Sequence, residues 1–192
     1  KERSAKKLYV DVMKYFTIIT ATIFLAVMIY YDLVQQFIGG EFHDSRGLVV
    51  VPVLLFANLF LGIYYNLSVW FKLTEKTRYG AYLALFGAVI TLALNFALIP
   101  VLGFEGSAWA TLICYFSMTV ASYFLGKKHY PIPYDLKRIG LYLGISLLLF
   151  TLSVYADLGM WVNTLYLFIF IGVAYILERP KKTLNSTPKL FD

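Results

Sequence analysis

The sequence predicts an all-α, polytopic integral membrane protein, a bundle of six transmembrane helices with both termini in the cytoplasm. Of its 192 residues 60% are hydrophobic and only 15% are charged, whereas a soluble domain carries about 25% charged residues. The charged residues leave six uncharged gaps, each close to the roughly 20 residues that a helix needs to cross a hydrocarbon core. These gaps are 15–31, 47–71, 79–104, 106–126, 139–156 and 158–177. A membrane β-barrel is excluded because its strands would be about 10 residues of alternating polarity.

The placement of lysine and arginine predicts the orientation. These residues are frequent before the first gap, after the second, after the fourth and after the last. The connection after the first gap holds only Arg46, and the connections after the third and fifth gaps hold none. Cytoplasmic loops carry the excess of Lys and Arg, so both termini are expected inside. The net charge of +6 therefore indicates a membrane topology and no nucleic-acid partner.

The expected helices are, in order, about 10–31, 47–71, 79–98, 107–125, 136–156 and 161–177. We divide the chain into four transmembrane helices of one lobe (1–126), a basic cytoplasmic connection (127–138), two peripheral transmembrane helices (139–178) and a disordered cytoplasmic tail (179–192). The sequence begins with a charged, helix-favouring run and not with methionine, so we expect an N-terminal truncation of a longer protein.

The sequence offers few groups for catalysis, and we predict neither an enzyme nor a cofactor or metal site. By the charge argument His43 and His129 lie on opposite sides of the membrane, each expected as a solvated loop residue. No common nucleophile, zinc or phosphate-binding motif is present. Cys114 is expected to act as a small apolar filler within the fourth helix.

Uncharged polar residues within the gaps are the candidates for a substrate path. Such residues more often bond across helices or back to their own helix than bind a ligand. Three asparagines, Asn58, Asn66 and Asn95, are the least compatible with lipid, and two of them, Asn58 and Asn95, should face a neighbouring helix or a wet cavity. Two tyrosines lie at an aromatic-rich cytoplasmic end. The candidates are Asn58, Asn95, Tyr64 and Tyr65.

Proline, glycine and other small residues predict where the helices turn and pack. Pro52 is expected to kink the second helix, because proline removes a backbone hydrogen bond. Pro100 and Gly103 are expected to end the third helix, and the fourth is expected to begin at Gly106. Small residues at helical spacing allow another backbone to approach closely. The expected packing residues of the fourth helix are Gly106, Ser107, Ala110 and Thr111, with Glu105 placed favourably for the helix dipole.

The stretch "NFALIPVLGFEGSAWATLICY", residues 95–115, resembles the repeated hairpin of polysaccharide flippases in the multidrug, oligosaccharidyl-lipid and polysaccharide exporter superfamily. That hairpin reads approximately Asn, an apolar run, Ile-Pro, a short turn, Gly, two residues and Gly-Ala-Ala-x-Ala-Thr. The residues at the matching places are Asn95, Ile99, Pro100, Gly103, Gly106, Ala108, Ala110 and Thr111, with Ser107 replacing the first alanine. The specific motifs, including the segment 62–82, cover about fifty residues of this chain.

The resemblance implies the C-terminal portion of an O-antigen type flippase in the bacterial inner membrane. Such a protein moves undecaprenyl-diphosphate-linked oligosaccharide to the periplasmic leaflet by alternating access of two lobes, for lipopolysaccharide or surface polysaccharide biosynthesis. The implied partners are the lipid bilayer, the lipid-linked oligosaccharide and the missing N-terminal helices of the same chain. Two alternatives remain open: a cation-coupled multidrug antiporter of the same superfamily, and a non-transporting scaffold subunit of a glycan-synthesis complex.

Overall fold

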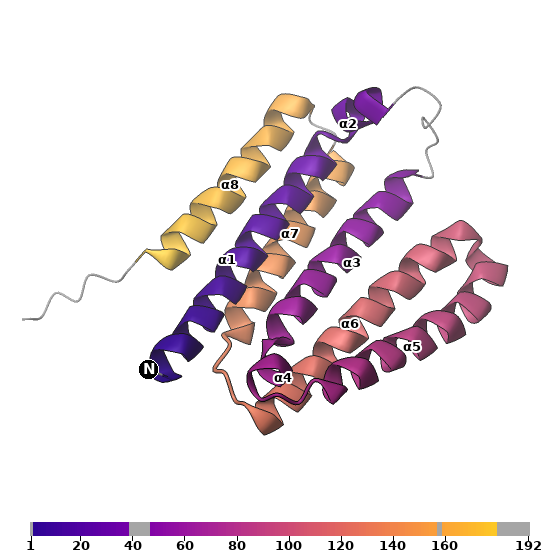
Figure 1. Cartoon of the computed structure of the whole chain (residues 1–192). Coiled ribbons are helices and arrows are strands. Elements are labelled where there is room, and N and C mark those ends of the chain that lie inside the picture. Colours follow the sequence, from indigo (N-terminus) through magenta and orange to yellow (C-terminus); the bar gives the residue numbers. More distant parts are fainter. Residues whose placement is uncertain (1, 39–46, 157–158, 180–192) are drawn as a thin grey trace, which may run out of the picture.

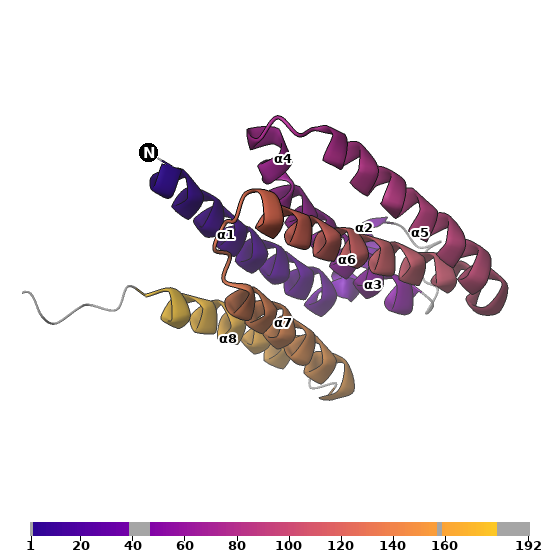
Figure 2. The same ribbon diagram turned by 90° about the horizontal axis from the view of Figure 1, so that it is seen from below.

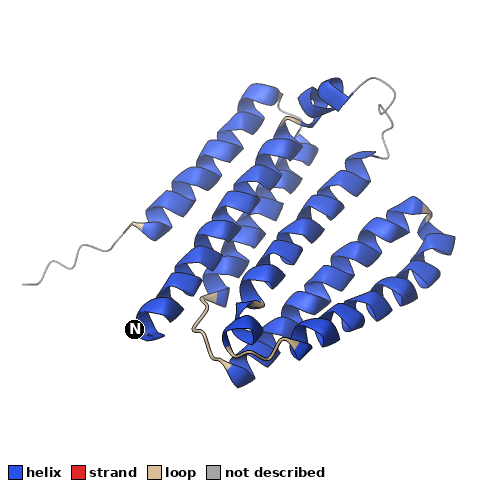
Figure 3. Ribbon diagram, viewed as in Figure 1, coloured by secondary structure: helices blue, strands red, loops and turns tan. Residues whose placement is uncertain are grey.

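The computed structural model describes residues 2–38, 47–156 and 159–179, and within these ranges the regular structure is helical (Figures 1 and 3). Two helices are short, α2 (Tyr31–Ile38) and α4 (Val69–Leu73). Six are long and apolar enough to cross a membrane, α4 extending the second of them. The long helices are α1 (Glu2–Ile29), α3 (Gly47–Leu67), α5 (Arg78–Leu102), α6 (Phe104–His129), α7 (Leu136–Ala156) and α8 (Met160–Glu178). The predicted all-α bundle with six membrane-spanning helices is therefore confirmed.

The turn between α5 and α6 differs from the prediction. Pro100 does not end the helix: α5 continues to Leu102, and the Gly103 amide donates to the Ile99 carbonyl at 2.8 Å. Gly103 has a φ of 62°, a left-handed conformation that glycine adopts without a Cβ penalty. The fourth long helix begins at Phe104 and not near residue 107. In lipid the backbone N–H and C=O groups have no water to bond and are best paired within a helix. The helical hydrogen bonds of α5 therefore continue as far as Gly103.

The long helices are arranged as a row with a second layer on one side (Figures 1 and 2). In the row, α5 packs against α6, α6 against α3, and α3 against α1. Helices α7 and α8 pack against α1 and against each other. We call the end of the bundle that holds the start of α1, α4, the α6–α7 connection and the end of α8 the basic end. It is the end that the distribution of Lys and Arg predicts to be cytoplasmic.

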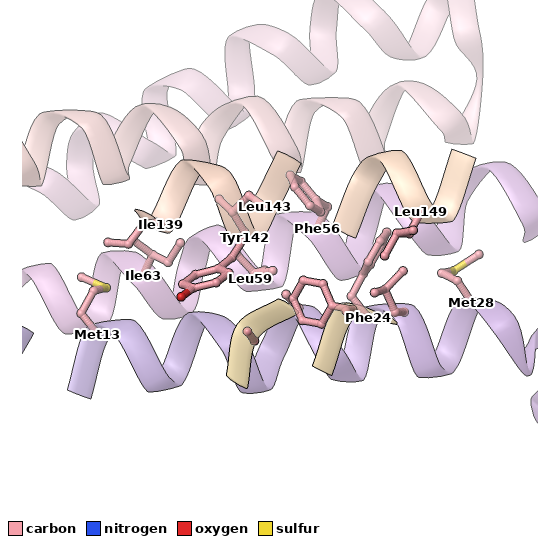
Figure 4. Packing of buried hydrophobic residues seen from close by; sticks show 14 of the residues in the cluster. Met13, Phe24, Met28, Phe56, Leu59, Ile63, Ile139, Tyr142, Leu143 and Leu149 are labelled. Atoms are coloured by element: carbon pink, nitrogen blue, oxygen red, sulfur yellow. The ribbon is translucent and has the colours of Figure 1, made fainter. Parts of the chain in front are cut away.

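The larger hydrophobic core lies between α1, α3, α7 and α8 (Figure 4). Phe24 of α1 is central to it: its ring makes edge contacts with Phe56 of α3 and Phe150 of α7, both with centroids 5.5 Å apart. Tyr142 of α7 and Phe170 of α8 are fully buried there. Helix α7 is thus part of the packed core of the described chain, because one face of its apolar run meets α1.

Helix α5 lies at the opposite edge of the bundle and packs mainly on α6. Only Leu83 and Gly87 of α5 are buried, while Phe96 and Val101 are about four-fifths exposed. Large apolar side chains thus cover its outer face, which is compatible with contact to lipid or to further helices.

Candidate functional site

The face of α3 that points away from both α1 and α6 carries two of the four substrate-path candidates. Asn58 and Tyr65 are both exposed and lie seven residues apart, so they occupy the same side of the helix. The Asn58 side-chain amide donates to the Leu54 carbonyl at 2.8 Å, one turn back. The Asn58 carbonyl oxygen, its second amide hydrogen and the Tyr65 hydroxyl remain available on this face for an external ligand.

The other two candidates lie elsewhere. Tyr64 is buried in a second hydrophobic cluster between α3, α5 and α6, with its ring centroid 5.6 Å from that of Tyr65. Asn95 lies on α5, and its side-chain oxygen is buried without a hydrogen-bond partner among the described residues. The structure therefore places Asn58 and Tyr65 on one exposed face of α3, while Tyr64 is buried and Asn95 lies on α5.

Gly106, the first small residue of α6, lies at the interface with α5. Gly106 and Ala110 are buried, and a Cβ added at Gly106 would come within 2.6 Å of the Leu98 carbonyl carbon. Ser107 and Thr111 flank this contact half-buried, with the Thr111 hydroxyl donating to the Ser107 carbonyl at 2.9 Å. Because the Thr111 hydroxyl bonds to a carbonyl of its own helix, this polar side chain lies in an apolar helix at a small cost in free energy.

Further along α6, Cys114 continues the contact with α5. Its thiol lies 3.3 Å from the Gly87 carbonyl of α5, and Met118 packs where a Cβ at Gly87 would be. Cys114 is buried and free. On the other face of α6 the Thr119 hydroxyl donates to the Phe60 carbonyl of α3 at 2.9 Å. Helix α6 is thus held on both sides by close approach and by cross-helix bonds.

An apolar cleft of about 530 Å³ opens between α1, α3, α6 and α7. Pro52, within α3, lies on the wall of this cleft. Six aromatic side chains also line it: Phe24, Phe56, Phe60, Trp109, Phe116 and Phe150. Five of them form a continuous chain of edge contacts from Phe150 to Phe116. The cleft offers almost no polar surface, so it suits hydrocarbon and not sugar.

Charged residues meet at the basic end, which the sequence alone did not reveal. The Glu178 carboxylate of α8 accepts from Lys14 of α1 at 2.6 Å, from Tyr142 of α7 at 2.7 Å and from Arg138 of α7 at 3.1 Å. Lys14 and Glu178 are only 18% and 13% exposed. The sequence signal was present only as charges at the ends of three apolar runs, and nothing in their spacing indicated that they pair.

The environment of His129 also differs from the one predicted from the sequence. It was expected in a solvated loop, but it lies half-buried in the last turn of α6, stacked on Trp70 with ring centroids 5.2 Å apart. Its Nδ1 lies 3.0 Å from the Leu125 carbonyl and its Nε2 3.1 Å from the Tyr79 hydroxyl. A carbonyl only accepts, so Nδ1 carries the hydrogen, and in the neutral ring Nε2 accepts from Tyr79. The contact joins α4, α5 and α6. His43 lies outside the described residues.

Half of the basic connection predicted at 127–138 is helical. Residues 127–129 end α6 and 136–138 begin α7, which leaves 130–135 as the link. Within the described residues no group of three or more His, Cys, Asp or Glu side chains is placed to hold a metal ion. Of the tail predicted at 179–192, only Arg179 lies within the described residues.

Comparison of the chain with protein-family models, with curated proteins and with solved structures gives no match. The arguments for function therefore rest on the residues and their geometry, together with the resemblance of the 95–115 hairpin.

Proposed function

We propose that this chain is the C-terminal part of a flippase that moves undecaprenyl-diphosphate-linked oligosaccharide across the bacterial inner membrane by alternating access. The observation that carries the proposal is the hairpin at 95–115, whose glycine and small residues serve as a close contact between two antiparallel membrane-spanning helices. Gly106 lies against the Leu98 backbone, and Gly103 makes the turn. A close helix contact at Gly106 and a turn at Gly103 are roles that would require glycine in each copy of such a repeated hairpin.

The face of α3 with Asn58 and Tyr65 is the part of this chain that we assign to the substrate path. An amide and a phenol both donate and accept hydrogen bonds, as sugar hydroxyls do. The large apolar cleft on the other side of α3 lacks such groups. Oligosaccharide is therefore expected against the α3 face, and not in the cleft.

The test is transport by the protein encoded by the complete gene, measured as translocation of lipid-linked oligosaccharide into membrane vesicles. Removing one uncharged hydrogen bond to a ligand costs about 0.5–1.5 kcal/mol, so Asn58→Ala and Tyr65→Phe should each slow transport about two- to tenfold. Ser117→Ala and Tyr82→Phe are matched controls, since the Ser117 hydroxyl donates to the Ile113 carbonyl of its own helix and the Tyr82 side chain is exposed on α5. They should transport at the unchanged rate.

Deletion of the gene separates the alternatives. Loss of surface polysaccharide is the expected result. An unchanged surface glycan with altered drug resistance would instead support the multidrug antiporter. Loss of surface glycan together with absence of transport by the purified protein would support the scaffold subunit.

A further inference from the structure

Three buried polar atoms that have no hydrogen-bond partner among the described residues belong to residues lining one small cavity at the basic end. They are the indole Nε1 of Trp70, the hydroxyl oxygen of Ser122 and the hydroxyl of Tyr134. The cavity is lined by residues of α3, α4, α6 and the 130–135 link, and all three of these residues belong to its wall. Buried polar groups almost always have a hydrogen-bond partner, so three unpartnered groups around one cavity require a common explanation.

The packing of α6 explains why these groups meet. Ser122 is fully buried, and Gly126 lies one turn further on the same face of the helix. A Cβ at Gly126 would come within 3.2 Å of the Trp70 Nε1, so the absence of a side chain there lets the indole edge lie on α6 near Ser122. Trp70 is 1% exposed and is held in this position by the His129 ring stacked on its face.

The chemistry of the three groups is complementary to one small neutral ligand. The indole nitrogen only donates, whereas a serine and a tyrosine hydroxyl each donate or accept. Burial, with a smaller contribution from the nearby Tyr9, raises the pKa of Tyr134 to about 12. Its hydroxyl is therefore protonated at neutral pH. No charged group is required of the ligand, and one acceptor with two donors satisfies all three atoms.

The volume of the cavity limits the size of the ligand. Its volume is about 10 Å³, and a cavity needs about 10–15 Å³ to hold one water molecule, which then makes about three hydrogen bonds. We propose that this cavity binds a single structural water molecule, which accepts from the Trp70 indole and bonds the hydroxyls of Ser122 and Tyr134. The water joins α4, α6 and the link to α7, three segments that meet at the basic end.

The sign of a stability change tests the proposal in the purified full chain in detergent. If the Tyr134 hydroxyl bonds a water, Tyr134→Phe leaves that water short of a partner and lowers the thermal unfolding midpoint, and Ser122→Ala does the same. If the hydroxyls are truly unpartnered, removing them relieves a desolvation cost, and the midpoint rises. Tyr123→Phe is the control: Tyr123 lines the same cavity, but its hydroxyl is not among the buried unpartnered atoms. It should leave the midpoint unchanged.

A direct measurement supports the stability test. With ¹⁵N-labelled tryptophan, the Trp70 indole N–H should give a cross-relaxation peak at the water frequency, and Tyr134→Phe and Ser122→Ala should both shift its resonance. The resonances of Trp109 and Trp161 serve as references. A water peak together with lowered midpoints is the expected result. A rise in the midpoint of both variants, or a Trp70 resonance with no contact to water, overturns the proposal.

Discussion

Gly106 of α6 lies against the backbone of Leu98 in α5, so that a Cβ at position 106 would come within 2.6 Å of both the carbonyl carbon and the oxygen of Leu98. The neighbouring atoms belong to a helix backbone and cannot rotate away as a side chain can. The two helices therefore approach as closely as they do because residue 106 is a glycine.

Gly106→Ala is predicted to destabilise the bundle, because α5 must move away from α6 to admit the methyl group. We expect a loss of about 1–3 kcal/mol, the cost of overpacking a close contact. The free energy of unfolding in mixed micelles measures it. Gly144→Ala is the control, since in the described part of the chain no atom beyond its neighbours and its own helix backbone lies within 4 Å of the added Cβ. That variant should gain about 0.5–1 kcal/mol from helix propensity. Equal effects of the two substitutions would contradict the close-contact interpretation.

Glu178→Gln is predicted to weaken the attachment of α8. Lys14 would then lie largely buried without its 2.6 Å partner. Breaking a buried ion pair costs more than breaking an exposed one, and for this partly buried pair we expect about 1–3 kcal/mol. Thermal unfolding in detergent at constant salt measures the loss.

Asp135→Asn is the matched control for Glu178→Gln. Asp135 pairs with Arg138 at 3.1 Å, but both side chains are 48% exposed, so the loss should stay below about 1 kcal/mol. If the two variants lost equal stability, the special weight given to the Lys14–Glu178 pair would be wrong.

Phe24→Ala is predicted to lower stability by about 2 kcal/mol or more, because it opens a cavity where three aromatic rings meet. In a membrane the stabilisation lost with the Phe24 ring comes mainly from van der Waals packing, since lipid is as apolar as the core. Phe96→Ala removes the same ring from a side chain that is 80% exposed and should change the unfolding free energy by about 0.5 kcal/mol or less. A large effect of Phe96→Ala would indicate that another helix covers α5 in the folded protein.

The topology predicts which positions an impermeant thiol reagent reaches in intact cells. In a Cys114→Ala background, a cysteine replacing Glu105 at the α5–α6 turn should label from outside. A cysteine replacing Thr77, between α4 and α5, should label only after the membrane is permeabilised. The opposite pattern would show that the basic end faces outward. Labelling of both without permeabilisation would exclude a membrane-spanning α5.

The sequence by itself determined the fold class and most of the helices. Uncharged runs long enough to cross a bilayer predicted all six, and residues 136–156 matched α7 at both ends. Such runs need no knowledge of neighbours, because the backbone in lipid must satisfy its hydrogen bonds within each helix. The sequence also predicted that small residues share one face of α6, since they recur at helical spacing.

Only the tertiary structure decided which residues meet. Lys14, Arg138 and Glu178 lie on three helices, and His129, Tyr79 and Trp70 on three others. The first group forms where the ends of α7 and α8 meet the middle of α1, and the second where α4 meets the ends of α5 and α6. Both meetings depend on packing angles that no local pattern encodes. The same holds for Asn58 and Asn95. Both are polar residues in apolar runs, but only the placement of α3 and α5 leaves the Asn58 side chain exposed and buries the Asn95 side-chain oxygen.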